Sequence, residues 1–380
     1  MKIKTINIKS LRNHSHTRLD FSPSMNIFYG LNGAGKTTIL EAISMSSLTK
    51  SFTIYGDDHL IKFDFEGFTI NAELERDRGT EFSLTISKLK RNKKCINSSF
   101  QDNMRPKDVI GLIPIIILSP DAKDITFGSP ENRRKFIDST ISQVSSIYLD
   151  DLYRYNKVLK QRNNLLKKVE RIDEFDNSEL KLWTEQLINI AVRLIKKRAM
   201  FIEEIKPSFV KYYSTISDKR EDVSLNYKPN GIKKQNISDL ERDDLLQLLT
   251  EYSEQKKEIE FRRQTTMFGP HKDELELYIN EHLVRDTASQ GQHKSVLISL
   301  KLSEFDYIRE LHNEIPIVLL DDIFSELDEK RIKLVLEVIN NNLAQAFVTI
   351  TELDKIKRIL NDKEDVNYYK IEDGKVKEKK

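Results

Sequence analysis

The chain is poor in the residues that build covalent cross-links and membrane spans. Its 380 residues include one cysteine, Cys95, which excludes an intramolecular disulfide and a zinc site with four thiolate ligands. No apolar run approaches the length of a membrane span, because the longest candidate, residues 113–118, is interrupted by Pro114. The first eight residues alternate like a strand and lack the apolar core of a signal peptide. We therefore expect a cytoplasmic protein without a membrane partner.

The chain also lacks a strong excess of charge of either sign. Charged residues make up 32% of it, yet the formal net charge is only +2. Bulk electrostatics therefore do not indicate a nucleic-acid binder, and any DNA-binding surface must come from local clusters of lysine and arginine. Hydrophobic residues contribute 38%, which is typical of an ordinary core combined with long, solvated helices.

Glycine is absent from residues 131–217, where Pro207 is the single proline. Apolar side chains recur there at spacings of three and four, which predicts a long amphipathic helix. These side chains are Leu180, Trp183, Leu187, Ile190 and Leu194. A turn at 229–231 precedes a second helix predicted over 239–263. We interpret residues 128–267 as an inserted antiparallel helical arm (lobe II).

The flanking regions predict strands mixed with helices. Residues 68–74 and 82–89 alternate and should pair with each other. Mainly apolar runs, typical of strands buried on both faces, occupy 113–118, 317–320 and 346–350. Residues 274–279 and 283–286 flank a predicted hairpin turn, a helix is predicted over 292–310, and the lysine-rich tail from Asp373 is predicted to be frayed. The predicted fold is α/β, with residues 1–127 and 268–380 forming one head (lobe I).

A phosphate-binding loop is the most specific motif. The run Gly30-Leu31-Asn32-Gly33-Ala34-Gly35-Lys36-Thr37 fits G-x-x-x-x-G-K-[ST] at every fixed position, between a predicted strand and a predicted helix. Its glycines allow the backbone N–H groups to converge on phosphates, and the helix adds its positive N-terminal end. We expect these residues and Thr38 to bind ATP, with Lys36 reaching the β and γ phosphates and Thr37 ligating Mg²⁺.

Two carboxylates end the apolar run 317–320. Asp321 and Asp322 follow it directly, which is where the acidic partner of a phosphate-binding loop is expected. We assign Asp321 to Mg²⁺ and Asp322 to orienting or deprotonating the attacking water, so that Asp322 and Lys36 are the predicted catalytic residues.

Two further motifs resemble those of ABC-type ATPases. Ser289, Gly291 and Gln292 match their signature motif, at the start of a predicted helix and about 25 residues before the strand that ends in the two carboxylates. The run 325–328, Ser-Glu-Leu-Asp, resembles their D-loop. The chain is therefore similar to an ABC-type P-loop ATPase head with an inserted antiparallel helical arm.

The length of the insertion narrows the resemblance to the RecF family of bacterial recombination mediators. ABC transporters separate the two motifs by a shorter helical subdomain, and SMC-type proteins by a far longer coiled coil. The supporting segments are Phe21-Ser22-Pro23, Ser119-Pro120-Asp121, 128–138, 159–166, 268–273 and 347–351. Together they run nearly from end to end of the chain.

The resemblance implies an ATP-dependent homodimer in which the loop of one subunit faces the signature motif of the other. It also implies binding to single-strand/double-strand junctions or gaps, weak DNA-stimulated ATPase activity that acts as a switch, and cooperation with RecO and RecR in loading RecA. Such a protein would act in DNA repair, replication recovery and the SOS response.

DNA contacts should be made mainly to phosphates. The candidates are Arg12, Arg133, Arg134, Lys135, Arg154, Lys157, Lys160, Arg162, Lys196, Lys197 and Arg198. For any single residue among them, a place on a solvated helix face is a simpler interpretation than a contact with DNA.

Three alternatives remain open from the residues. The chain could be an ABC transporter nucleotide-binding subunit, an SMC-like structural DNA tether, or a nuclease-coupled ATPase. The inserted arm argues against a transporter subunit, because transporters have a shorter helical subdomain. The modest length of the arm argues against an SMC-like tether, and the chain has no room for a nuclease domain.

Overall fold

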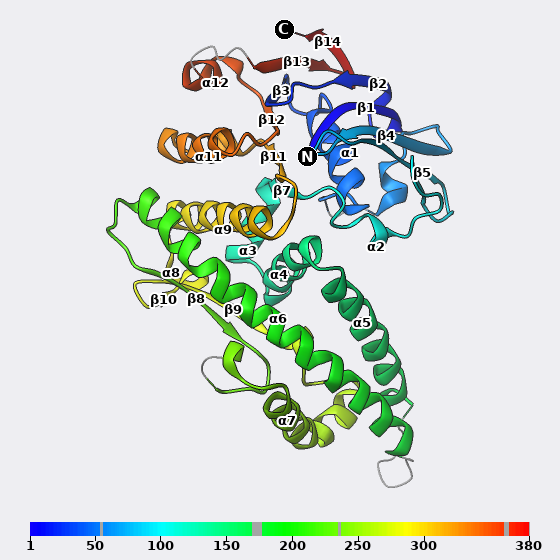
Figure 1. Ribbon diagram of the computed structural model, residues 1–380, viewed down its shortest axis with the longest axis vertical. Helices are drawn as coiled ribbons and strands as arrows, with labels where there is room; N and C mark the ends of the chain where they lie inside the picture. The colour runs from blue at the N-terminus through cyan, green and yellow to red at the C-terminus, as the bar shows by residue number, and fades with distance from the viewer. Residues whose placement is uncertain (54–55, 169–176, 235–236, 361–364, 380) are drawn as a thin grey trace. The chain divides into compact units, whose positions relative to one another are not determined.

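The computed structural model describes residues 1–53, 56–168, 177–234, 237–360 and 365–379. It divides into two compact units (Figure 1): Met1–Lys123 with Lys294–Lys380, and Asp124–His293. The predicted boundary at 267/268 is therefore displaced, because residues 268–293 belong to the second unit. Strand β9 within these residues pairs with β8 (Val223–Lys228), and the sequence analysis did not predict β8. No helix in the described ranges is long and apolar enough to cross a membrane.

The first unit contains a five-stranded antiparallel sheet of order β2-β1-β4-β5-β6. Its strands are β1 (Lys2–Leu11), β2 (His14–Asp20), β4 (Gly67–Glu75), β5 (Glu81–Leu89) and β6 (Cys95–Ser98). The predicted pairing of 68–74 with 82–89 is confirmed, with Ile70 opposite Ile86. Short helical turns, η1 (Asp57–Leu60) and α2 (Pro106–Val109), lie in the connections of this region.

A six-stranded sheet of order β14-β13-β3-β12-β11-β7 forms the other layer of this unit. Its strands are β3 (Met25–Tyr29), β7 (Ile115–Leu118), β11 (Ile317–Asp321), β12 (Ala346–Ile350), β13 (Val366–Glu372) and β14 (Lys375–Lys379). All neighbours are parallel except β13 and β14. The predicted frayed tail is wrong, because β14 forms a charged edge strand whose lysines alternate along an antiparallel hairpin.

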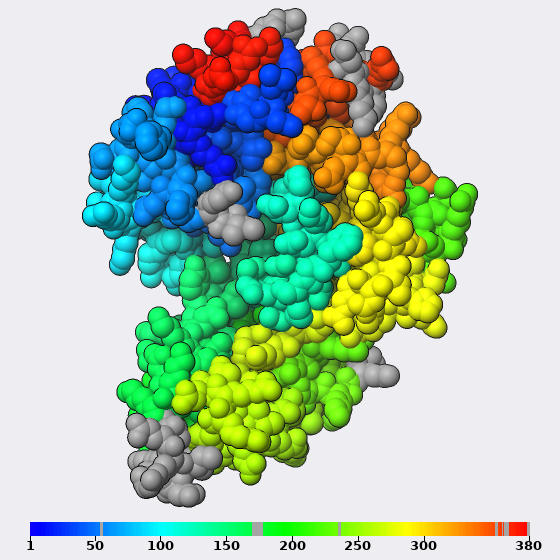
Figure 2. Space-filling model, turned by 180° about the vertical axis from the view of Figure 1, so that it is seen from behind, coloured from blue at the N-terminus to red at the C-terminus, as the bar shows by residue number. Residues whose placement is uncertain are grey.

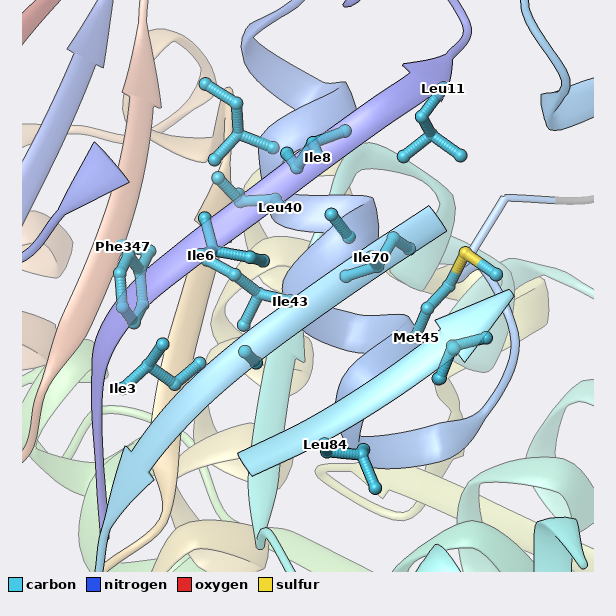
Figure 3. Packing of buried hydrophobic residues seen from close by; sticks show 14 of the residues in the cluster. Ile3, Ile6, Ile8, Leu11, Leu40, Ile43, Met45, Ile70, Leu84 and Phe347 are labelled. Carbon is cyan, nitrogen blue, oxygen red and sulfur yellow. The ribbon is translucent and has the colours of Figure 1, made fainter. Parts of the chain in front are cut away.

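Helix α1 (Lys36–Leu48) packs between the two sheets. Every residue from Thr38 to Ser47 is buried, as expected of a helix covered on all sides. Figure 3 shows Leu40 and Ile43 of α1 beside Ile6 of β1, within a large hydrophobic cluster of this unit. Helices α11 (Glu329–Asn341) and α12 (Leu353–Leu360) lie on the other side of the six-stranded sheet (Figure 1). The remaining short elements are η2 (Pro120–Lys123) and α10 (Ile323–Glu326).

The second unit is mainly helical. Its helices are α3 (Asp124–Phe127), α4 (Pro130–Val144), α5 (Ser146–Leu166), α6 (Asn177–Ser217), α7 (Arg242–Arg263) and α8 (Val284–Thr287), and α9 (Gln290–Leu311) starts in it. The end of α5 contacts the start of α6 through Arg162 and Thr184, and the start of α5 contacts a later turn through Tyr148 and Arg198. This register makes α5 and α6 an antiparallel helix pair, which the sequence analysis did not predict. The helix that it predicted over 239–263 is present as α7.

A three-stranded sheet accompanies these helices. It has the order β10-β9-β8, from β8 (Val223–Lys228), β9 (Glu274–Ile279) and β10 (His282–Leu283), with the short turns η3 (Ile237–Asp239) and η4 (Pro270–Lys272) nearby. The predicted hairpin is confirmed for β9 and β10, but its second strand ends at Leu283, where α8 begins. The predicted apolar stripe is buried at Leu180, Leu187, Ile190 and Leu194, while Trp183 is half-buried.

Candidate nucleotide site

The phosphate-binding loop joins β3 to α1, as the motif predicted. Gly35 is the N-terminal cap of α1 and has φ 108°. A Cβ atom at this position would lie 2.6 Å from Nε2 of His14, so both the backbone angle and the space require glycine. The tip of the loop is open, and Leu31 is 84% exposed. The free N–H groups of the first turn of α1 therefore adjoin an exposed, glycine-rich loop, which is the arrangement that binds anions.

Lys36 lies under this loop and is 6% exposed. Its ammonium donates to the carbonyl oxygens of Gly30 and Leu31, at 2.7 and 2.9 Å. Burial lowers the pKa of Lys36, against the opposing influence of Asp322 and Asp321. Thr38, 3% exposed, places its hydroxyl 3.5 Å from Oδ1 of Asn13.

Asp321 meets the loop at the carboxyl ends of the parallel strands. The Thr37 hydroxyl donates to its Oδ1 at 2.9 Å, and the Thr349 hydroxyl donates to the same oxygen at 2.7 Å. Thr349 is opposite Asp321 in the register of β11 and β12. Burial raises the pKa of Asp321, and the two hydroxyl donors lower it. A hydroxyl and a carboxylate thus converge, and hard oxygen ligands of this kind suit Mg²⁺.

Asp322 adopts a left-handed backbone conformation, with φ 48°. Its N–H donates to Thr349 Oγ1 at 2.8 Å, and its carbonyl accepts from Ser325 at 2.7 Å. Its Oδ1 is buried without a hydrogen-bond partner among the described residues. A buried carboxylate oxygen without a donor is costly, which fits a position that a water or another polar group completes.

These groups fit a magnesium–triphosphate complex. The loop and the start of α1 supply N–H donors, Lys36 supplies a cation, and Thr37 with Asp321 supplies oxygen ligands. The structure thus brings the predicted loop, the start of α1 and the end of β11 together.

The predicted signature residues lie at the start of α9, in the second unit. Ser289 and Gln292 cap the helix reciprocally: Gln292 N–H donates to Ser289 Oγ at 3.2 Å, and Ser289 N–H donates to Gln292 Oε1 at 2.7 Å. Gln292 Nε2 also donates to Glu221 at 2.7 Å. Ser289 and Gly291 are exposed. The motif is therefore an N-terminal cap whose outer residues remain accessible.

The predicted D-loop follows β11. Asp328 caps α11 by accepting from Arg331 N–H at 2.9 Å, and Lys294 donates to the Glu326 carbonyl at 2.6 Å. These bonds fix the backbone of this segment within the first unit.

Three of the predicted DNA contacts are wrong, because their guanidinium groups are buried in internal ion pairs. Arg133 is 3% exposed and pairs with Glu274 at 2.7 Å. Arg162, also 3% exposed, pairs with Glu260 at 2.7 Å. Arg198 is 2% exposed and donates to carboxylates that are themselves largely buried. Groups committed in this way are not available to DNA phosphates.

Two further predicted DNA contacts, Arg12 and Arg134, make hydrogen bonds within the protein. Arg12 donates to Glu41 at 2.7 Å and to Thr53 at 3.0 Å, and Arg134 donates to the Asp273 carbonyl at 2.7 Å. The candidates that remain on the surface are Lys135, Arg154, Lys157 and Lys160, with Lys196 and Lys197 half-buried.

Thr349 is a site residue to which the sequence analysis assigned no role. It is 1% exposed and bonds both members of the acidic pair. The available signal was a hydroxyl residue within the otherwise apolar strand 346–350, because a buried hydroxyl requires partners.

Comparisons with known proteins agree with this geometry. A family model for the RecF/RecN/SMC N terminal domain matches residues 2–375. The DNA replication and repair protein RecF of Phocaeicola vulgatus is 34% identical over 383 residues, which cover 100% of this chain and 99% of that protein. A structure of the recombination mediator RecF with ATP, in the RecFOR pathway, has a TM-score of 0.88 and 31% identity, covering 99% of this chain and 96% of that one.

A more distant likeness concerns the fold alone. An Smc head bound to the C-terminal winged-helix domain of ScpA has a TM-score of 0.56 at 14% identity, covering 99% of this chain and 96% of that one. The full-length match to the RecF protein and to the RecF structure is closer in sequence and in fold. The chain belongs to the RecF family of DNA replication and repair proteins.

Proposed function

We propose that this protein binds ATP with Mg²⁺ at the loop Gly30–Thr38 and uses it to dimerise on DNA. The observation that carries the proposal is the 2.9 Å hydrogen bond between Thr37 and Asp321, which brings the loop and the acidic strand end into one site. The ATP-bound state reported for a RecF relative supports the choice of nucleotide.

Each residue has a role that follows from its chemistry. The loop N–H groups and Lys36 bind the phosphates, and Thr37 and Asp321 hold the metal. Bound Mg²⁺ neutralises charge on the phosphates. Asp322, whose buried Oδ1 has no hydrogen-bond partner within the described part of the chain, accepts a hydrogen bond from the attacking water and orients it.

The signature residues complete the site of a second subunit. Ser289 and Gly291 are exposed at the positive end of α9, which suits them to contact a γ-phosphate held by another copy of the protein. ATP then joins two subunits, and hydrolysis releases them. The enzyme is in this view a weak, DNA-stimulated ATPase that acts as a switch.

The dimer holds DNA at gaps or single-strand/double-strand junctions and, with RecO and RecR, promotes RecA loading. The RecFOR pathway named for the RecF relatives supports these partners. Exposed lysines and arginines such as Lys135, Arg154, Lys157 and Lys160 contact phosphates, so DNA affinity falls steeply with salt.

Sedimentation velocity with combinations of ATP, Mg²⁺ and gapped DNA tests this proposal. We expect a monomer without nucleotide, a dimer with MgATP, and a dimer that co-sediments with gapped DNA. A protein that binds MgATP but stays monomeric, with and without DNA, would overturn the proposed mechanism.

A further inference from the structure

Three consecutive carbonyl groups of the phosphate-binding loop accept hydrogen bonds from other parts of the first unit. Asn13 Nδ2 donates to the Gly33 carbonyl at 3.2 Å. The N–H of Gly374 donates to the Ala34 carbonyl at 2.8 Å, and His14 Nε2 donates to the Gly35 carbonyl at 3.0 Å. Donors from two separate hairpins, β1–β2 and β13–β14, therefore meet one short loop.

These bonds control the direction of the loop's N–H groups. In a planar trans peptide the C=O of one residue and the N–H of the next point in opposite directions. Fixing the carbonyls of Ala34 and Gly35 therefore fixes the N–H groups of Gly35 and Lys36 toward the opposite side. Those N–H groups belong to the cap and first residue of α1, where a phosphate would be bound.

His14 is built into this arrangement as a neutral donor. It is fully buried, and burial lowers its pKa. A carbonyl can only accept, so the hydrogen-bond network assigns the proton to Nε2. Nδ1 then accepts from the Thr17 hydroxyl, 2.8 Å away. Lys62 donates to the Asn13 carbonyl at 2.7 Å, so the turn between β1 and β2 is also bonded to Lys62.

The β13–β14 hairpin approaches the loop through backbone atoms. Gly374 has φ 69°, and a Cβ there would collide with the carbonyl oxygen of Asn13. A Cβ on Gly30 would likewise collide with the carbonyl oxygen of Ile371 in β13. Figures 1 and 2 both show this last part of the chain, in red, next to the blue N-terminal strands.

We propose that Asn13, His14 and the β13–β14 hairpin form a clamp that holds the phosphate-binding loop in its anion-binding conformation before nucleotide arrives. The clamp residues position the loop and do not touch the phosphates. Preorganisation of this kind raises affinity because binding no longer has to order the loop. The inference rests on the proposed nucleotide binding by that loop, and it makes a hairpin remote in sequence a determinant of ATP affinity.

The first test replaces His14. In His14→Leu the Gly35 carbonyl loses its side-chain donor. We expect the Kd for MgATP, measured by calorimetry well below the unfolding temperature, to rise about tenfold, which corresponds to one hydrogen bond. His14→Gln retains an N–H donor of similar reach and should recover most of the affinity.

The matched control for His14 is Ser47→Ala. It removes another buried hydrogen bond of the same unit, from Ser47 to the Ile113 carbonyl at the far end of α1. It should lower the unfolding temperature and leave the Kd for MgATP unchanged. If His14→Leu changes the Kd no more than Ser47→Ala does, the clamp is refuted.

The second test compares two glycines in hairpin turns. Gly374→Ala forces a Cβ against Asn13 and should weaken MgATP binding about tenfold, since it separates the hairpin from the loop. Gly79→Ala has nearly the same backbone strain, with φ 81°, but its Cβ would meet nothing within 4 Å. Equal Kd values for these two variants would refute the role of the hairpin.

Lys36→Ala separates failure of the clamp from failure of the proposed function. If Lys36→Ala abolishes MgATP binding while the His14 and Gly374 variants bind like the unmodified protein, only the clamp is wrong. If Lys36→Ala binds MgATP normally, the loop is not the nucleotide site and both proposals fail.

Discussion

Replacing Thr349 by valine removes one hydroxyl that serves two partners at the end of β12. The substitution preserves the shape of a side chain that is 1% exposed, so packing changes little. It takes the Thr349 acceptor from the part-buried N–H of Asp322 and one donor from the Asp321 carboxylate. An unsatisfied N–H costs about 1–3 kcal/mol and a hydrogen bond to a charged group contributes about 1.5–3 kcal/mol. Because the Asp322 N–H is only part-buried, its cost lies at the lower end of that range, and we expect the free energy of unfolding to fall by about 2.5–4 kcal/mol in total.

The loss should depend on pH. Burial raises the pKa of Asp321 while the Thr349 and Thr37 hydroxyls lower it, so Thr349→Val raises this pKa further. When the folded pKa of a carboxyl group lies above its unfolded value, the free energy of unfolding of the protein falls as the pH rises from the unfolded pKa through the folded pKa. The stability deficit of Thr349→Val should therefore be largest at neutral pH and shrink as the pH falls below the raised pKa.

Urea unfolding followed by circular dichroism measures this deficit between neutral and acidic pH. Thr349→Ser is the control, because it keeps the hydroxyl and loses a methyl group at a cost of about 0.5–1.5 kcal/mol. Equal stability of the valine and serine variants at neutral pH would refute the account of Thr349.

Three further outcomes follow from the site and the second unit. Asp322→Asn should reduce ATP hydrolysis by about a hundredfold or more while its ATP dimer persists on DNA in sedimentation, and a monomeric variant with ATP would contradict our role for Asp322. Ser289→Arg should bind MgATP in calorimetry like the unmodified protein yet remain monomeric, and an ATP-driven dimer would show that the signature residue lies outside the interface. Arg162→Met should destabilise the second unit by about 3–5 kcal/mol in urea, because it leaves Glu260 buried and unpaired, and unchanged stability would contradict a structural role.

The parts of the fold that sequence could predict are those set by short-range patterns. Mainly apolar runs predicted β11 and β12, and the fixed spacing of Gly30, Gly35 and Lys36 predicted the loop between β3 and α1. The approach of Thr37 to Asp321 follows from the parallel order of β3, β12 and β11. The loop comes after the carboxyl end of β3 and the acidic pair lies at the carboxyl end of β11, so both lie at the same edge of the sheet.

The missed features depend on partners far away in sequence. Arg162 finds Glu260 at a separation of 98 residues, and Arg133 finds Glu274 at 141. A sequence does not distinguish an arginine on the surface from one that is buried in an ion pair. Arg133 and Arg162 were therefore predicted to contact DNA together with the exposed residues. Strand β14 was missed for a related reason, because its lysines suggest a solvated tail until β13 is available as a partner.

The claim that two subunits share each nucleotide site is tested most directly by mixing two inactive variants. Lys36→Ala lacks a working loop and Ser289→Arg lacks a working signature, so each alone should remain monomeric with MgATP. A mixture can form a heterodimer with one intact site, made from the loop of the Ser289→Arg subunit and the signature of the Lys36→Ala subunit. We predict that sedimentation equilibrium with MgATP shows this heterodimer, at higher protein concentration than the unmodified dimer needs. A mixture that stays as monomeric as its two components would contradict the shared site.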